Sequence, residues 1–166
     1  MENNERMVNK IKEGIVIDHL PSGSAFKILS LSNNIRKHKG RIAVLSNTKS
    51  SKLGMKDIIK IEGKSLDYGE MSSISLIAPN ATICKISEYG VSEKHTVSIP
   101  DKISGILNCS NMNCISNNDV EAIGDFSTIS KDPLILICNY CNTAMLKEDI
   151  LQKLNQKPFS AQNSNK

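Results

Sequence analysis

The chain has 166 residues, enough for one ordinary domain or for two small ones. Its hydrophobic content of 39% argues against global disorder, and with 4% aromatics and no Trp the core must be aliphatic. Three lysines of an acid-free C-terminal tail (Lys153, Lys157, Lys166) supply three of the four net positive charges, so the rest of the chain lacks the charge of a broad nucleic-acid surface.

The N-terminus and the distribution of apolar residues indicate in which cellular compartment the protein is expected. The first ten residues, "MENNERMVNK", lack the apolar core of a signal peptide, and no apolar run reaches the roughly 18 residues of a membrane span. We therefore expect a cytoplasmic protein with no membrane partner. A reducing compartment disfavours disulfides and favours metal binding by clustered cysteines.

Six secondary-structure elements are expected in the first 91 residues. Apolar, β-branched runs predict strands, and the spacing of Ile28, Leu31 and Ile35 predicts a helix that Ser22 or Ser24 could cap. In chain order we expect a strand at 14–20, a helix at 24–37, a strand at 41–47, a polar loop at 48–54, a strand at 55–63, a helix at 67–77 and a strand at 81–91. This order, β-α-β-β-α-β, predicts a ferredoxin-like sheet domain.

The remaining sequence predicts a second, small module in which short apolar pieces such as "LILIC" (134–138) surround four cysteines. The expected fold class is α+β, with an N-terminal ferredoxin-like βαββαβ domain and a C-terminal small β-rich zinc-binding domain of rubredoxin-like type. The expected boundaries are residues 1–99, residues 100–152 and a polar, loosely ordered tail at 153–166.

Four of the five cysteines form two close pairs, Cys109 with Cys114 and Cys138 with Cys141. Tetrahedral Zn²⁺ takes four thiolates at about 2.3 Å, and two tight turns that supply two sulfurs each are its usual structural site. A small module with few aromatics buries little apolar surface, so the metal would supply much of its folding free energy. We predict one structural Zn²⁺, with no open position for catalysis.

The cysteine pattern also allows roles other than zinc binding. Iron suits the same four sulfurs, whereas a disulfide framework or a redox-active pair accounts for the pattern less well. Four incidental thiols, some of them buried as small hydrophobes, are the bland alternative. Cys84 stands apart in a predicted strand and is expected in the core or in a pocket.

Seven motifs follow one another along the chain: "MVNKI" (7–11), "GIVIDHLPSG" (14–23), "RIAVLSN" (41–47), "GMKDIIKIEG" (54–63), "APNATICKISEYGVSEK" (78–94), "CSNMNCIS" (109–116) and "CNYC" (138–141). Each motif alone is weak. Together they resemble the regulatory chain of aspartate carbamoyltransferase over about residues 8–150.

This resemblance implies a non-catalytic allosteric subunit of the enzyme that commits carbamoyl phosphate to pyrimidine biosynthesis. The N-terminal domain would bind CTP or ATP at one site and would pair with a second copy through its sheet. The zinc domain would dock on the catalytic chain. The expected partners are therefore catalytic chains, a second regulatory chain and the two nucleotides, with no nucleic acid.

The resemblance also implies roles for polar residues of the nucleotide site. Asp18 would approach the ribose hydroxyls and steady a neighbouring lysine. His19 and Lys94 would face the triphosphate, Lys60 would donate to the base or the ribose, and Lys56 is a candidate for a further phosphate contact. Without the motifs, solvated surface lysines and a structural histidine would be the ordinary interpretation.

Apolar and backbone groups would hold the base. By the same resemblance, Val8, Ile11 and Ile86 would lie against it, and Tyr89 and Val91 would present backbone groups to its edge. Ile11 and Ile86 would otherwise be interpreted as core residues.

The partner surface and some departures from the family pattern complete the resemblance. Asn111 and Asn113 fit the loop that contacts the catalytic chain. Cys84 stands where better-known members have an asparagine near the base, so base discrimination is expected to differ. The second cysteine turn carries neutral residues where enteric relatives use charged ones: Asn139, Asn142 and Thr143.

Two rival functions belong to other classes. A zinc-ribbon nucleic-acid-binding protein would need basic and aromatic residues around the cysteines, yet the segment between Cys109 and Cys141 has a net charge of −3. A small-ligand enzyme would need a nucleophile or an acid–base pair, which only Asp18, His19 and Cys84 offer.

Overall fold

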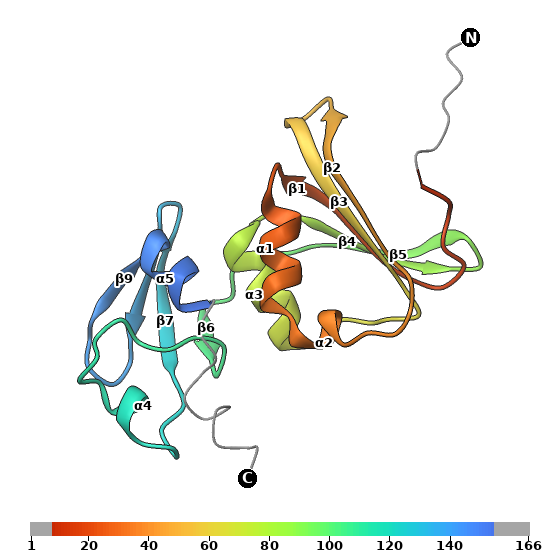
Figure 1. The fold of residues 1–166 in the computed structure, drawn as a ribbon. Coiled ribbons are helices and arrows are strands. Elements are labelled where there is room, and N and C mark those ends of the chain that lie inside the picture. Colours follow the sequence, from red (N-terminus) through yellow and green to blue (C-terminus); the bar gives the residue numbers. More distant parts are fainter. Residues whose placement is uncertain (1–7, 155–166) are drawn as a thin grey trace. The chain divides into compact units, whose positions relative to one another are not determined.

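The computed structural model describes residues 8–154. Contacts divide this part of the chain into two units, one formed by the residues up to Asp67 with Asn80–Val97, the other by Tyr68–Pro79 with the residues from Ser98 onward. Each unit contains one antiparallel sheet (Figure 1). The predicted α+β fold is thereby confirmed, with an N-terminal sheet domain and a small C-terminal β domain.

The first unit contains a five-stranded sheet in the order β2-β3-β1-β4-β5, with every neighbouring pair antiparallel. Its elements are β1 (Gly14–Pro21), α1 (Ser24–Leu31), α2 (Asn33–Arg36), β2 (Ile42–Ser50), β3 (Gly54–Glu62), β4 (Thr82–Ser87) and β5 (Gly90–Thr96). The first strand of the chain lies at the centre of the sheet, as the split βαβ order requires.

The two faces of this sheet differ because side chains alternate along β1. Ile15 and Ile17 are at most 4% exposed and share their face with Ile59, and α1 contacts β1 and β3. Val16 and Asp18 belong to the opposite face, which is called the outer face below. Asp18, one of the expected nucleotide-binding residues, therefore lies on the outer face.

Three expected boundaries are wrong. The helix expected at 24–37 is interrupted at Ser32, whose hydroxyl oxygen accepts the backbone N–H of Ile35 at 3.1 Å and so starts α2. The strand expected at 81–91 is a hairpin, because Glu88 and Tyr89 both have positive φ and form the turn between β4 and β5. The polar loop expected at 48–54 shrinks to three residues, since β2 continues to Ser50.

The start of α1 corrects another expectation. Its N-cap position is occupied by Gly23, with φ 83°, and no side-chain cap of the kind expected from Ser22 or Ser24 is present. Instead Oδ2 of Asp57, on β3, accepts the backbone N–H of Gly23 at 2.8 Å and that of Ala25 at 3.2 Å. A carboxylate from a distant strand thus replaces the local cap.

The second unit has a four-stranded sheet in the order β6-β7-β8-β9. Its elements are α3 (Tyr68–Ile77), β6 (Lys102–Ser104), α4 (Ile115–Asn118), β7 (Asp125–Lys131), β8 (Leu134–Cys138), β9 (Ala144–Leu146) and α5 (Lys147–Leu154). Its core is small and centres on Phe126, Leu136 and Met145, all fully buried. α3 contacts α5, a helix that the sequence reasoning did not anticipate.

The tail expected at 153–166 falls mostly outside the described residues, although its first two residues form the end of α5, where Leu154 is buried. Within residues 8–154, none of the helices has the length and apolarity needed to cross a membrane.

Candidate metal centre and effector face

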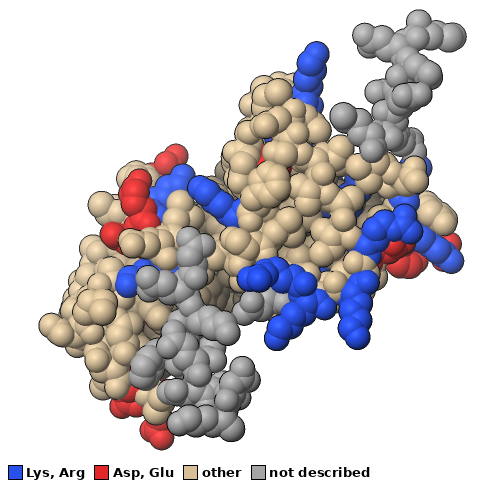
Figure 2. Space-filling view, viewed as in Figure 1, with Lys and Arg blue, Asp and Glu red and all other residues tan. Residues whose placement is uncertain are grey.

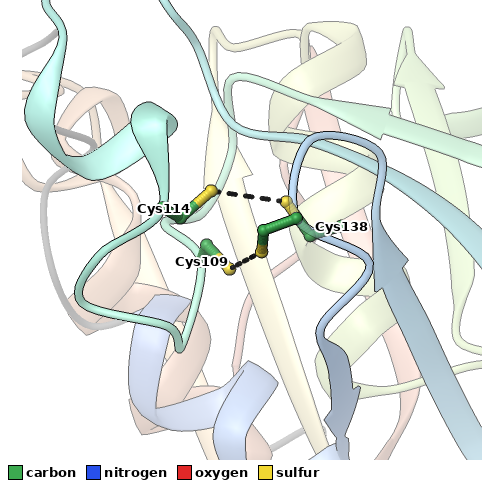
Figure 3. A group of neighbouring side chains, drawn as sticks. Cys109, Cys114 and Cys138 are labelled. Carbon is green, nitrogen blue, oxygen red and sulfur yellow. Dashed lines mark hydrogen bonds between the residues drawn. The ribbon is translucent and has the colours of Figure 1, made fainter.

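Four cysteine sulfurs converge in the second unit. The Sγ atoms of Cys109 and Cys141 are 3.6 Å apart, those of Cys114 and Cys138 are 3.7 Å apart, and all four lie within 4.8 Å of one another (Figure 3). Four sulfurs at about 2.3 Å from a tetrahedral ion are about 3.8 Å apart, whereas a disulfide needs about 2.05 Å. The cluster therefore has the geometry of a Cys₄ metal site and excludes the disulfide framework.

The two pairs of sulfurs come from elements that meet at one end of the second sheet. Cys109 and Cys114 flank the turn before α4, while Cys138 ends β8. Cys141 lies in the turn that follows β8. Two backbone hydrogen bonds close this turn, from Asn142 N to the Cys138 oxygen and from Cys138 N to the Thr143 oxygen. Three of the cysteines are buried and Cys141 is half-buried, as expected for a structural site without an open position.

The thiols differ in acidity. Burial raises the pKa of Cys109 and of Cys138. Hydrogen bonding with the Thr143 side chain, 3.2 Å away, lowers the pKa of Cys141 to about 6 although desolvation acts in the opposite direction. Because a bound cation favours the thiolate form, binding a divalent metal here would release protons from the buried thiols.

A row of directly opposed residues crosses the outer face of the first sheet. Ala43, Lys60, Val16, Cys84 and Lys94 pair in register across β2, β3, β1, β4 and β5. At about 4.8 Å per strand, the backbones that carry the two lysines are about 14 Å apart. Lys60 and Lys94, two residues of the expected nucleotide site, therefore lie on the same face with an uncharged strip between them.

Cys84 is the titratable residue of the uncharged strip, and it carries no charge at neutral pH. Cys84 is half-buried, and desolvation raises its pKa, although the charge of Lys94 acts in the opposite direction. The side chain is therefore a thiol at neutral pH, and it is a weak nucleophile.

Asp18 holds a polar cluster beside this row. Its Oδ1 is 2.8 Å from Nζ of Lys56, and it also accepts the backbone N–H of His19 at 2.6 Å. Burial raises the pKa of this carboxyl, but the hydrogen bonds from Lys56 and His19 and the charge of Lys56 lower it further, so the net shift is downward. Asp18 is therefore a carboxylate at neutral pH, which makes it a strong hydrogen-bond acceptor.

The backbone of His19 is unusual. Its φ of 59° lies in the left-handed region, at the irregularity between Ile17 and Leu20 in the pairing of β1 with β3. Its Nδ1 atom is buried, lies 3.6 Å from Oδ2 of Asp18 and has no hydrogen-bond partner among the described residues. The bulge thus redirects this imidazole to the neighbourhood of Asp18.

A cavity of about 300 Å³ opens at the β2 side of the row, lined by Val8, Asn9, Ile11, Arg41, Ala43 and Lys60. Nζ of Lys60 is 3.5 Å from the carbonyl oxygen of Val8. Three members of the expected nucleotide site, Val8, Ile11 and Lys60, are therefore brought together here. The walls combine apolar side chains with two cations at the rim, a composition typical of small-molecule sites.

The other expected base contacts lie near the β4–β5 turn. Ile86 is buried and is paired with Val91, which is 61% exposed, while Tyr89 is 55% exposed in the turn itself. The backbone N–H of Tyr89 donates to the carbonyl oxygen of Lys12 at 3.1 Å. This bond uses the Tyr89 N–H group and ties the N-terminal segment to the turn.

Comparisons with known proteins give the family. The sequence model of the aspartate carbamoyltransferase regulatory chain, allosteric domain, matches residues 6–98, and that of the metal binding domain of the same chain matches residues 101–151. The chain belongs to the family of aspartate carbamoyltransferase regulatory chains. It is therefore related to a non-catalytic subunit, which agrees with the Cys₄ site that has no open position.

Individual relatives align with this chain over nearly their whole length. The aspartate carbamoyltransferase regulatory chain of Thermococcus onnurineus is 46% identical over 150 residues, which are 90% of this chain and 99% of the relative. Those of Saccharolobus islandicus and Sulfolobus acidocaldarius are each 46% identical over 151 residues, 90% of this chain and 94% and 92% of theirs. The resemblance inferred from the motifs is thus confirmed.

Within this regulatory chain, the residues expected at the partner surface divide into two groups. Asn113 is exposed and Asn111 half-buried, both in the turn between the first two cysteines. Asn139 is also exposed, but its side-chain amide forms two hydrogen bonds within the chain. Its Nδ2 donates to Asp125 at 2.8 Å and its Oδ1 accepts from the Ser127 hydroxyl at 2.8 Å. Its uncharged amide therefore serves to hold the second cysteine turn to β7.

The sequence reasoning missed several residues of the candidate sites. Asn9, Arg41 and Ala43 line the cavity, and only the strand register shows that Ala43 faces Lys60. Asp57 was also missed, although it gave the same signal as Asp18, a carboxylate in an apolar strand that needs partners.

Proposed function

We propose that this chain is the allosteric effector subunit of an aspartate carbamoyltransferase, in which CTP and ATP compete for the outer face of the N-terminal sheet. A difference in nucleotide affinity between two quaternary states would shift the catalytic chains from one state to the other. A coupling of about 1–3 kcal/mol is sufficient for a 5–150-fold effect.

The observation that carries the nucleotide proposal is the clustering of cations around apolar surface on one face. Lys60 and Lys94 end the uncharged strip, and Lys56 is fixed by Asp18 at 2.8 Å. Such cations favour phosphate binding, and the Asp18 carboxylate is a strong acceptor for the ribose hydroxyls. His19, beside Asp18, supplies a further ring nitrogen for the triphosphate.

The base would occupy the apolar end of the same face. Val8 and Ile11 line the cavity next to Lys60, whereas Ile86 and Val91 form the pair at the β4–β5 turn. The carbonyl oxygen of Tyr89 would accept from an amino group on the base edge. Both CTP and ATP carry such an exocyclic amino group, which explains how one site would accept either.

The metal proposed for the Cys₄ site is Zn²⁺. The residues fit it because four sulfurs at near-tetrahedral spacing, three of them buried, match its preferred structural coordination. When bound, the ion would cross-link the turn before α4 to the end of β8. These two turns would then form a single surface for the catalytic chain.

The proposed docking surface is formed by the exposed turn Asn111–Asn113. Met112, at its centre, is 73% exposed, and Ile115 directly after Cys114 is 51% exposed. Most of the part of this unit seen in Figure 2 is uncharged, with acidic and basic groups at its margins. Exposed apolar side chains flanked by amides are characteristic of the centre of a protein–protein interface.

We also propose that two regulatory chains pair through the β2 edge of their sheets. The first four residues of this edge strand, Ile42–Leu45, are apolar and half-exposed, whereas the opposite edge strand β5 is exposed throughout and carries Glu93, Lys94 and His95. An unpaired, apolar edge favours strand addition, and a charged edge opposes it.

Calorimetric titration of the zinc-loaded chain tests the nucleotide proposal. We expect saturable CTP binding that ATP displaces. Replacing Lys94 by alanine should remove a charged phosphate contact worth about 2 kcal/mol, a roughly thirtyfold loss of affinity. Lys85→Ala is the matched control, because Lys85 lies on the neighbouring strand and forms an exposed ion pair with Glu93. A folded, zinc-loaded protein that binds neither nucleotide would contradict the proposal.

Cys84 offers a separate test of base recognition. Asn at this position could donate and accept hydrogen bonds that the thiol makes only weakly, so Cys84→Asn is expected to change the ratio of CTP to ATP affinity by roughly fivefold, about one hydrogen bond. Cys84→Ala serves as the control and should leave the ratio close to its original value. Equal changes for both nucleotides in Cys84→Asn would show that position 84 does not face the base.

A further inference from the structure

The longer of the two cysteine turns has an internal scaffold that the metal does not provide. Four residues separate Cys109 from Cys114, against two between Cys138 and Cys141. A metal ion fixes only the two sulfurs at the ends of such a turn. The intervening backbone, which would form the docking surface, needs other partners for its carbonyl groups.

Two consecutive asparagines at the end of α4 supply those partners. Nδ2 of Asn117 donates to the carbonyl oxygens of Cys109 at 2.9 Å and Asn111 at 2.7 Å. Nδ2 of Asn118 donates to those of Met112 at 2.9 Å and Cys114 at 2.8 Å. Each primary amide uses its two N–H groups to bridge two carbonyls, which a hydroxyl or a carboxylate cannot do.

Two further bonds are local to the turn. The backbone N–H of Asn113 donates to Oδ1 of Asn111 at 3.0 Å, and that of Cys114 donates to the Asn111 oxygen at 3.0 Å. Cys114, at the end of the turn, also contacts α4 through the backbone N–H of Asn117 at 3.0 Å and the Ser116 hydroxyl at 3.2 Å. The two asparagine amides, by contrast, reach the carbonyls of Asn111 and Met112 inside the turn and so link its middle to α4.

We propose that Asn117 and Asn118 are positioning residues that hold the Asn111–Asn113 turn in the shape that binds the catalytic chain, while the four cysteines hold the metal. This inference rests on the docking role proposed above. Asn118 is exposed, so its replacement removes the two bridging hydrogen bonds without opening a cavity. Asn117 is half-buried with a buried Oδ1 atom, and its replacement also disturbs packing.

The test measures metal content and affinity for catalytic chains on the same full-length variants. For Asn118→Ala we expect one zinc per chain, as in the unaltered protein, and roughly tenfold weaker binding to catalytic chains, at the lower end of the effect of losing a supporting shell. Asn118→Asp, which cannot donate to the two carbonyls, should bind at least as weakly. Asn34→Ala, an exposed asparagine on α2, is the matched control and should behave as the unaltered chain.

A double-mutant cycle separates positioning from direct contact. If Asn118 acts through the turn, Asn113→Ala should weaken binding clearly in the unaltered chain and much less in the Asn118→Ala background. Hydrogen exchange of the Met112 and Asn113 amides should accelerate in Asn118→Ala, while that of the Cys138–Cys141 turn stays unchanged.

Specific results would overturn the inference. Unaltered affinity in both Asn118 variants would show that the turn needs no such support, and loss of zinc together with affinity would show that the asparagines serve the metal site instead. If the unaltered, zinc-loaded chain itself fails to bind catalytic chains, the proposed function fails, and the docking role of the turn fails with it.

Discussion

Cys138→Ser is expected to abolish stable metal binding and to unfold the second unit. Cys138 is fully buried at the end of β8, and its sulfur is 3.7 Å from that of Cys114. Zinc binding to structural sites contributes on the order of 10 kcal/mol to folding at neutral pH. The core around Phe126, Leu136 and Met145 is too small to compensate for that loss, because small domains bury a limited fraction of their apolar surface.

The measurements are zinc content after dialysis and protection of amides in β7 and β8 against hydrogen exchange. Both should be lost in Cys138→Ser, together with assembly with catalytic chains. Cys84→Ser is the matched control, because Cys84 lies on β4 in the other unit and should leave zinc content unchanged. Full zinc content in Cys138→Ser would mean that three sulfurs suffice to hold the ion. The metal would then not need the closed Cys₄ site.

The acidity of the sulfurs gives this prediction a chemical basis. In the cluster, burial raises the pKa of Cys109 and Cys138, so without a cation these two thiols stay protonated, whereas Cys141, with a pKa of about 6, is a thiolate at neutral pH. Chelation of the metal should therefore leave the two turns unconnected. The expected outcome is release of catalytic chains that keep their own activity, since the metal would act through shape rather than chemistry.

Local sequence patterns predicted the elements well where a strand or turn is determined by its own residues. The β-branched run at 14–20 predicted β1 within one residue of its observed bounds, and the apolar run at 134–138, expected in a β-rich module, forms β8. The cysteine spacing predicted the sulfur cluster because both turns need only local geometry to direct two thiols to one point. Each of these features depends on side-chain alternation or on contacts a few residues apart.

Features set by contacts across the fold escaped prediction. The hairpin at Glu88 and Tyr89 required positive φ at two residues that are not glycine, so the sequence carried no strong turn signal. Arg41 and Ala43 line the cavity only because of the β2–β3 register. The serine cap was wrong since Asp57, more than thirty residues away, takes that role.

Asp57 lies in the motif "GMKDIIKIEG" (54–63), yet its role is structural and was not predicted from the sequence. It is fully buried and accepts four hydrogen bonds. Two come from the start of α1, and the other two come from the hydroxyl of Ser46 at 2.8 Å and the backbone N–H of Asn47 at 3.0 Å. One carboxylate therefore joins α1, β2 and β3 below the outer face, where the nucleotide site is proposed.

Asp57→Asn is expected to destabilise the first unit by about 3 kcal/mol at neutral pH. The amide keeps one acceptor oxygen, but its NH₂ group would face two of the four donors, and hydrogen bonds to a charged group are worth about 1.5–3 kcal/mol each. For a unit of this size the midpoint of thermal unfolding should fall by roughly 10–20 °C. Asp101→Asn is the control: its side chain is 89% exposed in an ion pair with Lys131, so little change is expected.

The pH dependence of the unfolding free energy tests whether the charge of the Asp57 carboxylate causes this stabilisation. Desolvation raises the pKa of Asp57, but the hydrogen bonds from Asn47, Ser46, Ala25 and Gly23 lower it further, so the net shift is downward. The stabilisation is therefore fully present above the unfolded pKa of about 3.9 and is lost as the pH falls through the lower pKa of the folded state. The difference in unfolding free energy between the unaltered chain and Asp57→Asn should shrink in that acidic range. A difference that is constant from pH 7 to pH 3 would mean that Asp57 stabilises the fold by shape and not by charge.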